Sequence, residues 1–214
     1  SLKNETIPSF GLSAKYTFDQ QSLNNAINSS QKGFMSIESG AKEQPNYIKS
    51  PNGMGLKLNG DAWMNTGVVG VFDKSDAFTV SMNLLIPKEF TEGVIFHKGI
   101  SERLYNFRGY HIYLRKDGIL EANLAHTAPS NAILKSSKKP IKKGQWINLT
   151  MTYEGSSKAN GLHVFVDGKE LDMKTETDEL TKSILFQSKN QPPLQIGAWG
   201  RGFGLKNGTV DDIL

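Results

Sequence analysis

Apolar and polar residues alternate with period two in two neighbouring runs, residues 147–154 and residues 163–166. In the first run Leu149 and Met151 fall on one side and Asn148 falls on the other. A gap rich in Gly, Ser and Asn separates the two runs. A two-residue period indicates a β-strand with one packed face and one solvated face, so the pair predicts an antiparallel hairpin.

Similar runs recur along the chain between Gly and Pro residues, and short helices are expected only at Ser22–Asn28 and Thr177–Ser183. The pattern predicts an all-β sandwich or jelly roll, with tight turns at Lys116–Gly118 and Asp167–Gly168. The expected strands are Tyr16–Asp19, Gly55–Asn59, Phe78–Ile86, Gly93–His97, Tyr110–Arg115, Ile119–His126, Ala132–Lys135, Ile147–Glu154, His163–Val166, Leu194–Gly197 and Thr209–Ile213.

No internal repeat or long linker divides the 214 residues, so a single domain is expected. Residues 1–13 are polar and contain Pro8 and Gly11, which indicates a lead-in or interdomain tail before a domain at residues 14–214. The chain has no cysteine, which excludes disulfides and thiolate metal sites. No run approaches the roughly 20 apolar residues that cross a membrane.

The formal net charge is +4, and part of it comes from a lysine cluster that Ser, Pro and Gly interrupt. The cluster has no interleaved aromatic residues that would stack on bases. A solvated loop therefore explains it better than a nucleic-acid site. The lysines are Lys135, Lys138, Lys139, Lys142 and Lys143.

A series of motifs runs through the chain in a characteristic order. They are YTFD (16–19), GLKLNGD (55–61), FTVSMNLLIP (78–87), GQWINLTMTYEG (144–155), LHVFVDGKEL (162–171), LQIG (194–197) and GTVDDI (208–213). Together they resemble a LamG-like domain of the concanavalin A-like lectin/glucanase superfamily. The resemblance implies an antiparallel two-sheet sandwich, a concanavalin A-like jelly roll, over residues 14–214. Its C-terminus is expected to be either truncated or a natural edge that neighbouring sequence completes.

Three segments, at residues 108–126, 130–146 and 153–168, are similar to a narrower group. They resemble the LamG-like domain of large planctomycete cytochrome C-type multidomain proteins. This implies a module of an exported bacterial protein, located outside the cytoplasm and flanked by other domains. Any haem chemistry would lie in those domains, because this chain has no cysteine.

Some proteins with this fold hydrolyse sugars, and laminarinase-like relatives carry the signature Glu-x-Asp-x-x-Glu. The nearest approach here is Glu176-Thr177-Asp178, which places Thr181 at the last position. Other carboxylates on expected solvated faces, such as Glu121, are isolated in the pattern. Retaining hydrolysis needs two carboxylates about 5 Å apart. We therefore expect no catalytic residues and no enzyme activity.

Polar and aromatic side chains are expected on the solvated face of two consecutive strands. Period-two counting places His111, Tyr113 and Arg115 on one side, and Glu121 and Asn123 on the matching side of the next strand. Rings cover the apolar face of a sugar while amide and guanidinium groups bind its hydroxyls, so this face is a candidate ligand site. An ordinary solvated sheet with pairs such as Arg115 and Glu121 is the alternative. The outer face of the first hairpin extends the candidate surface with Asn148, Thr150, His163 and Phe165.

Further candidates lie at strand ends and in Gly-rich connections, where sandwich domains often carry recognition residues. Trp199 fits either a sugar platform or a ring packed over the edge of the sandwich, and Trp63 and Trp146 are expected in the core. The loop candidates are Arg103, Tyr105, Arg108, His126, Asn131, Trp199 and Arg201.

Two acidic residues are candidates for a calcium site. Asp19 ends the first expected strand and Asp211 lies in the last. First and last strands are commonly neighbours in a jelly roll, and Ca²⁺ prefers carboxylate and carbonyl oxygens. The alternative is that each Asp caps backbone N–H groups in a turn.

The sequence thus predicts a non-catalytic recognition module that binds carbohydrate, without nucleic-acid or membrane partners. The alternative that remains open is a structural or protein-interaction domain, which would pack on neighbouring domains of its parent chain.

Overall fold

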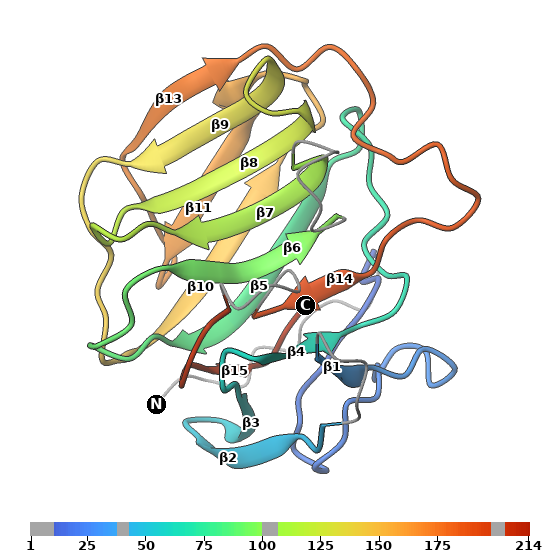
Figure 1. The fold of residues 1–214 in the computed structure, drawn as a ribbon, viewed down its shortest axis with the longest axis vertical. Helices are drawn as coiled ribbons and strands as arrows, with labels where there is room; N and C mark the ends of the chain where they lie inside the picture. Colours follow the sequence, from blue (N-terminus) through green and yellow to red (C-terminus); the bar gives the residue numbers. More distant parts are fainter. Residues whose placement is uncertain (1–10, 38–42, 100–106, 198–203) are drawn as a thin grey trace.

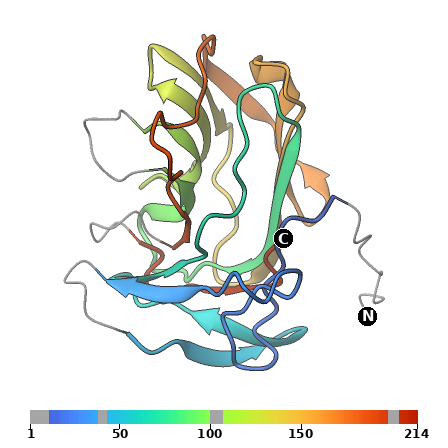
Figure 2. The ribbon, with the colours of Figure 1, turned by 90° about the vertical axis from the view of Figure 1, so that its right-hand side faces the viewer.

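Two antiparallel sheets packed face to face make up the protein. The computed structural model describes residues 11–37, 43–99, 107–197 and 204–214. In Figure 1 one sheet lies in front of the other, and Figure 2 shows the two layers from the side. Helical structure in the described ranges is confined to a 3₁₀ turn at Ala159–Gly161. The predicted all-β antiparallel sandwich is therefore confirmed, and within those ranges no helix has the length and apolar character of a membrane span.

The front sheet has eight strands and carries most of the candidate residues. Its strands in spatial order are β1 (Phe34–Ile37), β4 (Ala62–Asn65), β14 (Leu194–Ile196), β6 (Gly93–Lys98), β7 (Gly109–Leu114), β8 (Leu120–Thr127), β9 (Asn131–Ser137) and β13 (Met173–Asp178).

The back sheet has seven strands and contains the hairpin in which the alternation of apolar and polar residues is clearest. Its strands in spatial order are β12 (Lys169–Glu170), β11 (Leu162–Val166), β10 (Trp146–Tyr153), β5 (Phe78–Leu85), β15 (Thr209–Asp211), β3 (Gly53–Lys57) and β2 (Asn46–Ser50).

The hairpin of β10 and β11 forms with the expected register and facing. Met151 pairs with Val164, and both side chains are fully buried. After β11 the chain turns at Asp167 and Gly168, whose φ angles of 52° and 73° are those of a two-residue hairpin turn. The predicted hairpin is confirmed, and so is the predicted Asp-Gly turn, which joins β11 to β12.

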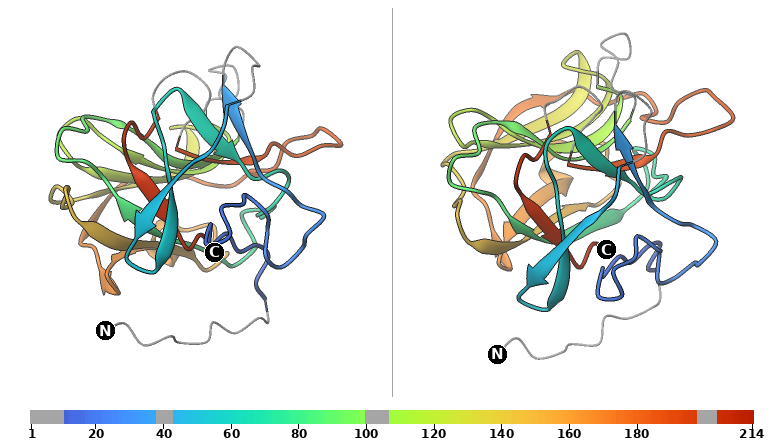
Figure 3. Two further views of the ribbon diagram at one scale, coloured as in Figure 1. Left: turned by 90° about the horizontal axis from the view of Figure 1, so that it is seen from below. Right: turned by 60° about the horizontal axis from the view of Figure 1, so that its bottom comes forward.

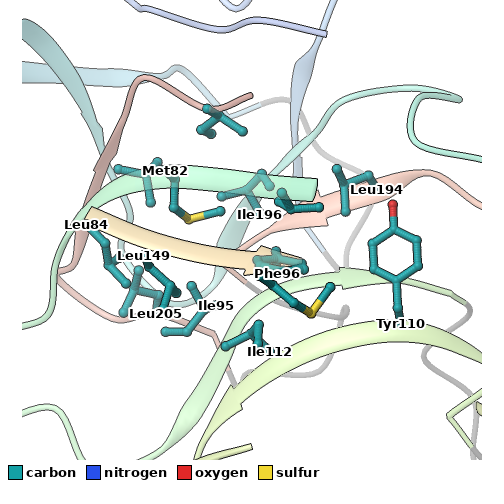
Figure 4. Close-up of a cluster of buried hydrophobic side chains, with 14 of the residues drawn as sticks. Met82, Leu84, Ile95, Phe96, Tyr110, Ile112, Leu149, Leu194, Ile196 and Leu205 are labelled. Carbon is teal, nitrogen blue, oxygen red and sulfur yellow. The ribbon is translucent and has the colours of Figure 1, made fainter. Parts of the chain in front are cut away.

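The core fills the space between the sheets. In Figure 4, Met82, Leu84 and Leu149 of the back sheet lie above Ile95 and Phe96 of the front sheet. All of them are at most 1% exposed. Removing such a side chain from water contributes about 1.5–3 kcal/mol to folding. On the long strand β5, where Met82 and Leu84 alternate with less buried residues, this burial fixes which face of the sheet points outward.

The first and last segments of the chain meet just beyond the end of β15, inside the back sheet. Tyr16 and Ile213 exchange backbone hydrogen bonds of 2.9 and 3.0 Å, and Figure 3 shows the dark-blue segment beside the C-terminal end. The expected strand at Tyr16–Asp19 is reduced to this isolated bridge. Expectation and structure agree on which ends pair, but the first pairing is shorter than predicted.

Neither of the two expected helices forms, so both predictions are wrong. Ser22–Asn28 forms bends and a bridge between Asn24 and Lys32. Thr177 and Asp178 instead continue strand β13, because their backbone pairs with β9. Trp63 is buried as expected, whereas Trp146 is half-buried at the start of β10.

Candidate functional site

The candidate ligand site lies on the outer face of the front sheet. Along β7, Ile112 and Leu114 point into the core and are fully buried, so His111 and Tyr113 point outward. On β8, Ala122 likewise faces the core. The outward direction expected for the candidate residues of these two strands is thus found.

A row of polar side chains crosses this face from strand to strand. Gln195, His97, His111 and Asn123 are successive cross-strand partners on β14, β6, β7 and β8. Three of them are buried, with His97 at 0%, His111 at 3% and Asn123 at 1% exposed. The expectation that His111 and Asn123 lie on a wet face is therefore wrong, and they form a polar layer beneath the surface.

Burial and hydrogen bonding constrain the two histidine rings of this layer. Burial, and then the neighbouring His111, lower the pKa of His97 to about 3, so the His97 ring stays neutral. Asn123 lies 3.5 Å from Nδ1 of His111, and Nε2 of His111 lies 3.2 Å from Oε1 of Glu121. The Asn123 amide donates and the Glu121 carboxylate accepts, so the proton of His111 belongs on Nε2.

Above this layer an arginine lies between two carboxylates. Arg115 donates from Nε to Glu121 at 2.9 Å, and from its two terminal nitrogens to both oxygens of Glu176 at 2.9 and 3.0 Å. The expected cross-strand pair of Arg115 and Glu121 is confirmed. Two-point bonding of this kind fixes the plane of the guanidinium group.

Glu121 is not isolated, which corrects the expectation, because it shares Arg115 with Glu176. Burial acts to raise the pKa of Glu121, but hydrogen bonds from His111 and Arg115 outweigh it and lower that pKa. The hydrogen bond from Arg115 lowers the pKa of Glu176, and Ser136 adds a second hydrogen bond at 2.7 Å. A glycosidase acid needs a raised pKa, so this carboxylate pair does not provide one.

Tyr113 is fixed by its hydroxyl group. Its Oη donates to Oε2 of Glu92 at 2.9 Å. Burial, followed by this bond and the charge of Glu92, raises the pKa of Tyr113, so the phenol stays protonated. The ring is half-buried and keeps one defined orientation on the outer face.

An exposed ring that the strand pattern missed completes this surface. Phe107 is 41% exposed, and its ring meets the His111 ring edge-on at a centroid distance of 6.0 Å. Phe107 precedes β7, so the period-two pattern of that strand did not include it. The sequence signal that could have identified it is an aromatic residue two positions before the glycine that begins β7. We call this surface the outer strip, which consists of Phe107, Tyr113, Arg115, Glu121 and Glu176, with the buried His111 and Ser136 beneath it.

Arg108 and His126 hold a loop against the end of the front sheet. His126 donates from Nδ1 to the Ser183 carbonyl at 2.6 Å, which leaves Nε2 to accept from Arg108 at 3.1 Å. The Arg108 guanidinium also covers the Phe186 ring at 5.7 Å from its centroid. These two candidates therefore pin the chain after residue 182 rather than line the outer strip.

Asn131 also has a structural role in the same loop. Its Oδ1 accepts the backbone N–H groups of Thr181 and Lys182 at 3.2 and 3.1 Å. Its amide nitrogen donates to the Thr181 hydroxyl at 2.7 Å. All polar atoms of the side chain are thus used to close the loop. Of the remaining loop candidates, Arg103, Tyr105, Trp199 and Arg201 lie outside the described residues.

Asn148 and Thr150 lie on the outer face of the back sheet, so they do not extend the outer strip. Their side chains bond to each other at 3.0 Å, and Asn148 also donates to Asn83 at 3.1 Å. Thr150 and Ser81 share a further hydrogen bond of 2.9 Å. The surface expected to be continuous is therefore two surfaces on opposite sides of the sandwich.

Asp19 and Asp211 lie near each other, close to the bridge between Tyr16 and Ile213. Burial, and then the charges of Asp212 and Asp19, raise the pKa of Asp211 to about 6, although a Ser50 hydrogen bond acts against this. Asp19 accepts the Met54 N–H at 3.0 Å and lies so close to Gly53 that a Cβ there would clash. Both carboxylates thus also cap their neighbours, as the alternative expectation held.

The negative charge of Asp19 and Asp211 suits a divalent cation, but two carboxylates are fewer ligands than such a cation needs. Mutual repulsion contributes to the raised pKa of Asp211, and a bound cation would relieve it. Within the part of the chain that the structure describes, however, no three His or acidic residues have metal-binding geometry. Backbone and hydroxyl oxygens would have to supply the other ligands.

The lysine cluster is divided by the fold. Lys135 turns inward from β9 and donates to the Leu162 carbonyl at 2.7 Å, and Lys143 donates to the Phe90 carbonyl. Lys138 forms an exposed pair with Asp172 at 2.9 Å. Lys135 therefore does not belong to a solvated loop, and the remaining lysines do not form one uniform basic patch.

Solved structures with the same fold include three that cover most of this chain. Domain 4 of AbnA, an extracellular arabinanase of Geobacillus stearothermophilus solved with arabinotriose, is 17% identical over 94% of this chain and 90% of its own, with a TM-score of 0.61. The binding domain of Paraclostridial Mosquitocidal Protein 1 is 14% identical over 94% of this chain and 47% of that one, at 0.63. The Trypanosoma rangeli sialidase with the inhibitor DANA is 14% identical over 97% of this chain, at 0.58.

The chain thus spans about half of the mosquitocidal protein structure and 30% of the sialidase chain. At these identities the likeness concerns the fold. No curated protein matches the sequence. A family model described as the concanavalin A-like lectin/glucanases superfamily matches residues 58–214, which is most of the chain. The protein belongs to the concanavalin A-like lectin/glucanase superfamily.

Proposed function

We propose that this protein is a non-catalytic carbohydrate-binding module and that the outer strip is its binding surface. The observation that carries the proposal is the set of rigid sugar-compatible groups on one outer face. Tyr113 is anchored by Glu92, and Arg115 is held in plane by Glu121 and Glu176. Polar groups held in place lose little entropy on binding, and rings cover the apolar face of a sugar.

The similarity in fold to the arabinanase domain supports this class of ligand, since that domain was solved with arabinotriose. The pKa values of Glu121 and Glu176 are lowered, so both carboxylates are ionised, which is compatible with a non-catalytic role. A hydrolase would need one carboxylic acid that keeps its proton near neutral pH.

A neutral glycan is the better ligand for the outer strip. Arg115 is already neutralised by two carboxylates, so it has little charge left for an acidic sugar. The oxygens of Glu121 and Glu176 retain acceptor capacity for sugar hydroxyl groups. Sialylated and sulfated glycans would instead meet negative charge there.

The domain that we propose as the binding unit comprises residues 14–214, because Ala14 is the first of the described residues to pack against the core. We further propose an extracytoplasmic location in an exported bacterial multidomain protein, on the basis of the LamG-like sequence pattern. A calcium ion at Asp19 and Asp211 is also proposed, with a role in joining the chain ends rather than in contacting the glycan.

A glycan array tests the function directly. The array should contain neutral, sialylated and sulfated oligosaccharides, with arabinotriose among the neutral ones. We expect binding to neutral glycans and loss of that binding in Tyr113→Ala. Absence of binding across all three groups would contradict the proposal and would favour a domain that packs on its neighbours in the parent chain.

A further inference from the structure

We infer that Phe107 is the stacking platform of the outer strip and that its backbone conformation is maintained to present the ring. This inference rests on the proposed glycan-binding function and identifies the residue that would recognise the apolar face of the sugar. The first observation is exposure. Phe107 is 41% exposed and lies at the end of a strip whose other members are polar or half-buried.

The second observation is the backbone of Phe107, which has φ of 61°. Residues with a Cβ seldom adopt a positive φ, and a bulky ring has no side-chain hydrogen bond that would favour it, unlike Asn or Asp. Strained conformations of this kind persist where the surroundings enforce them and are concentrated at ligand-binding sites.

Neighbouring residues enforce the conformation. The buried amide of Asn123 lies 3.5 Å from the Phe107 carbonyl, and Gly109 passes so close to the Lys98 carbonyl that a Cβ there would clash. Gly109 itself has φ of 106°, which only glycine adopts readily. The entry to β7 is therefore fixed on both sides, and the Phe107 ring is directed over His111.

The ring lies next to the hydrogen-bonding part of the strip. The His111 ring lies nearly perpendicular to the Phe107 ring, at an interplanar angle of 71°, and bonds to Glu121, which in turn bonds to Arg115. A sugar stacked on Phe107 would thus have carboxylate acceptors beside it. The ligand class that fits is a neutral sugar with an uninterrupted C–H face, because an aromatic ring binds such a face and not a charged one.

Three variants of Phe107 test the inference by calorimetry with a panel of neutral oligosaccharides that includes arabinotriose. Phe107→Tyr keeps the ring and should bind like the wild type. Phe107→Ala and Phe107→Asn should weaken binding about tenfold or more. Since Asn tolerates a positive φ, Phe107→Asn should also unfold at the same temperature as the wild type or higher.

The outcomes separate this inference from the proposed function. Unchanged affinity in Phe107→Ala, together with lost affinity in Tyr113→Ala, would overturn the platform and leave glycan binding intact. A lower unfolding temperature with unchanged affinity in Phe107→Asn would show that the ring only shields His111 from water. Failure of the wild type to bind any member of the panel would contradict both proposals.

Discussion

Arg115 and Glu176 form two parallel hydrogen bonds, of 2.9 and 3.0 Å, between the end of β7 and the outermost strand β13. Strands β8 and β9 lie between them, so this contact ties the edge of the front sheet to its centre. Glu176 occupies the irregular position in the β9–β13 pairing. Its carboxylate reaches Arg115 and Ser136 on the outer face from this position.

Glu176→Gln is expected to lower the free energy of unfolding by about 1 kcal/mol, because it removes the charge from a two-point pair. Urea denaturation measures the change. Asp172→Asn is the matched control, since it breaks the exposed pair with Lys138 and should cost less than about 0.5 kcal/mol. Equal losses in the two variants would contradict the structural role assigned to Arg115 and Glu176.

Asn131→Ala should destabilise the protein without changing glycan affinity. The side chain accepts two N–H groups and donates once, so its removal is expected to cost about 1–2 kcal/mol. Hydrogen exchange should become faster at Thr181 and Lys182. If Asn131→Ala instead weakened glycan binding at unchanged stability, the assignment of Asn131 to loop closure would be wrong.

Asp211 should make the folded state less stable as pH rises. Its pKa is about 6 in the folded protein, above its ordinary value, so the folded state binds the proton more tightly. The resulting stabilisation is present below about pH 4 and is lost as pH rises through about 6. The unfolding temperature of Asp211→Asn should therefore rise relative to that of the wild type as pH increases from about 4 to about 7. A constant difference across this range would contradict the raised pKa.

Calcium should reverse this effect if Asp19 and Asp211 bind it. We expect millimolar Ca²⁺ to raise the unfolding temperature of the wild type near neutral pH, and chelation to remove the increase. Asp19→Asn should not respond. An equal response of the wild type and Asp19→Asn would place calcium elsewhere, and no response in the wild type would exclude calcium as a ligand of these two carboxylates.

Period-two patterns identified most of the sandwich because the core demands alternation. Long strands such as β5 and β10 bury every second residue and were predicted almost to their ends. Strands β1, β2 and β13 were missed because they lie at sheet edges and are largely half-exposed. Where neither face is consistently apolar, alternation gives little signal.

The candidate site was only partly predictable. Alternation correctly directed Tyr113 and Arg115 outward, since it depends on neighbours along one strand. It does not reveal what covers an outward side chain, so the burial of His111 was not foreseen. It also does not assign strands to sheets, and for this reason Asn148 was joined to a surface on the opposite side of the molecule.

The central claim is that the outer strip of the front sheet binds glycan. Its most direct test is calorimetric titration of the best-binding neutral oligosaccharide into the wild type, Tyr113→Ala and Thr152→Ala. Thr152 is a matched control, because it lies on the outer face of the back sheet between Thr79 and His163. We predict that Tyr113→Ala loses at least about tenfold in affinity and that Thr152→Ala binds like the wild type. Loss of affinity in Thr152→Ala with full retention in Tyr113→Ala would contradict the account.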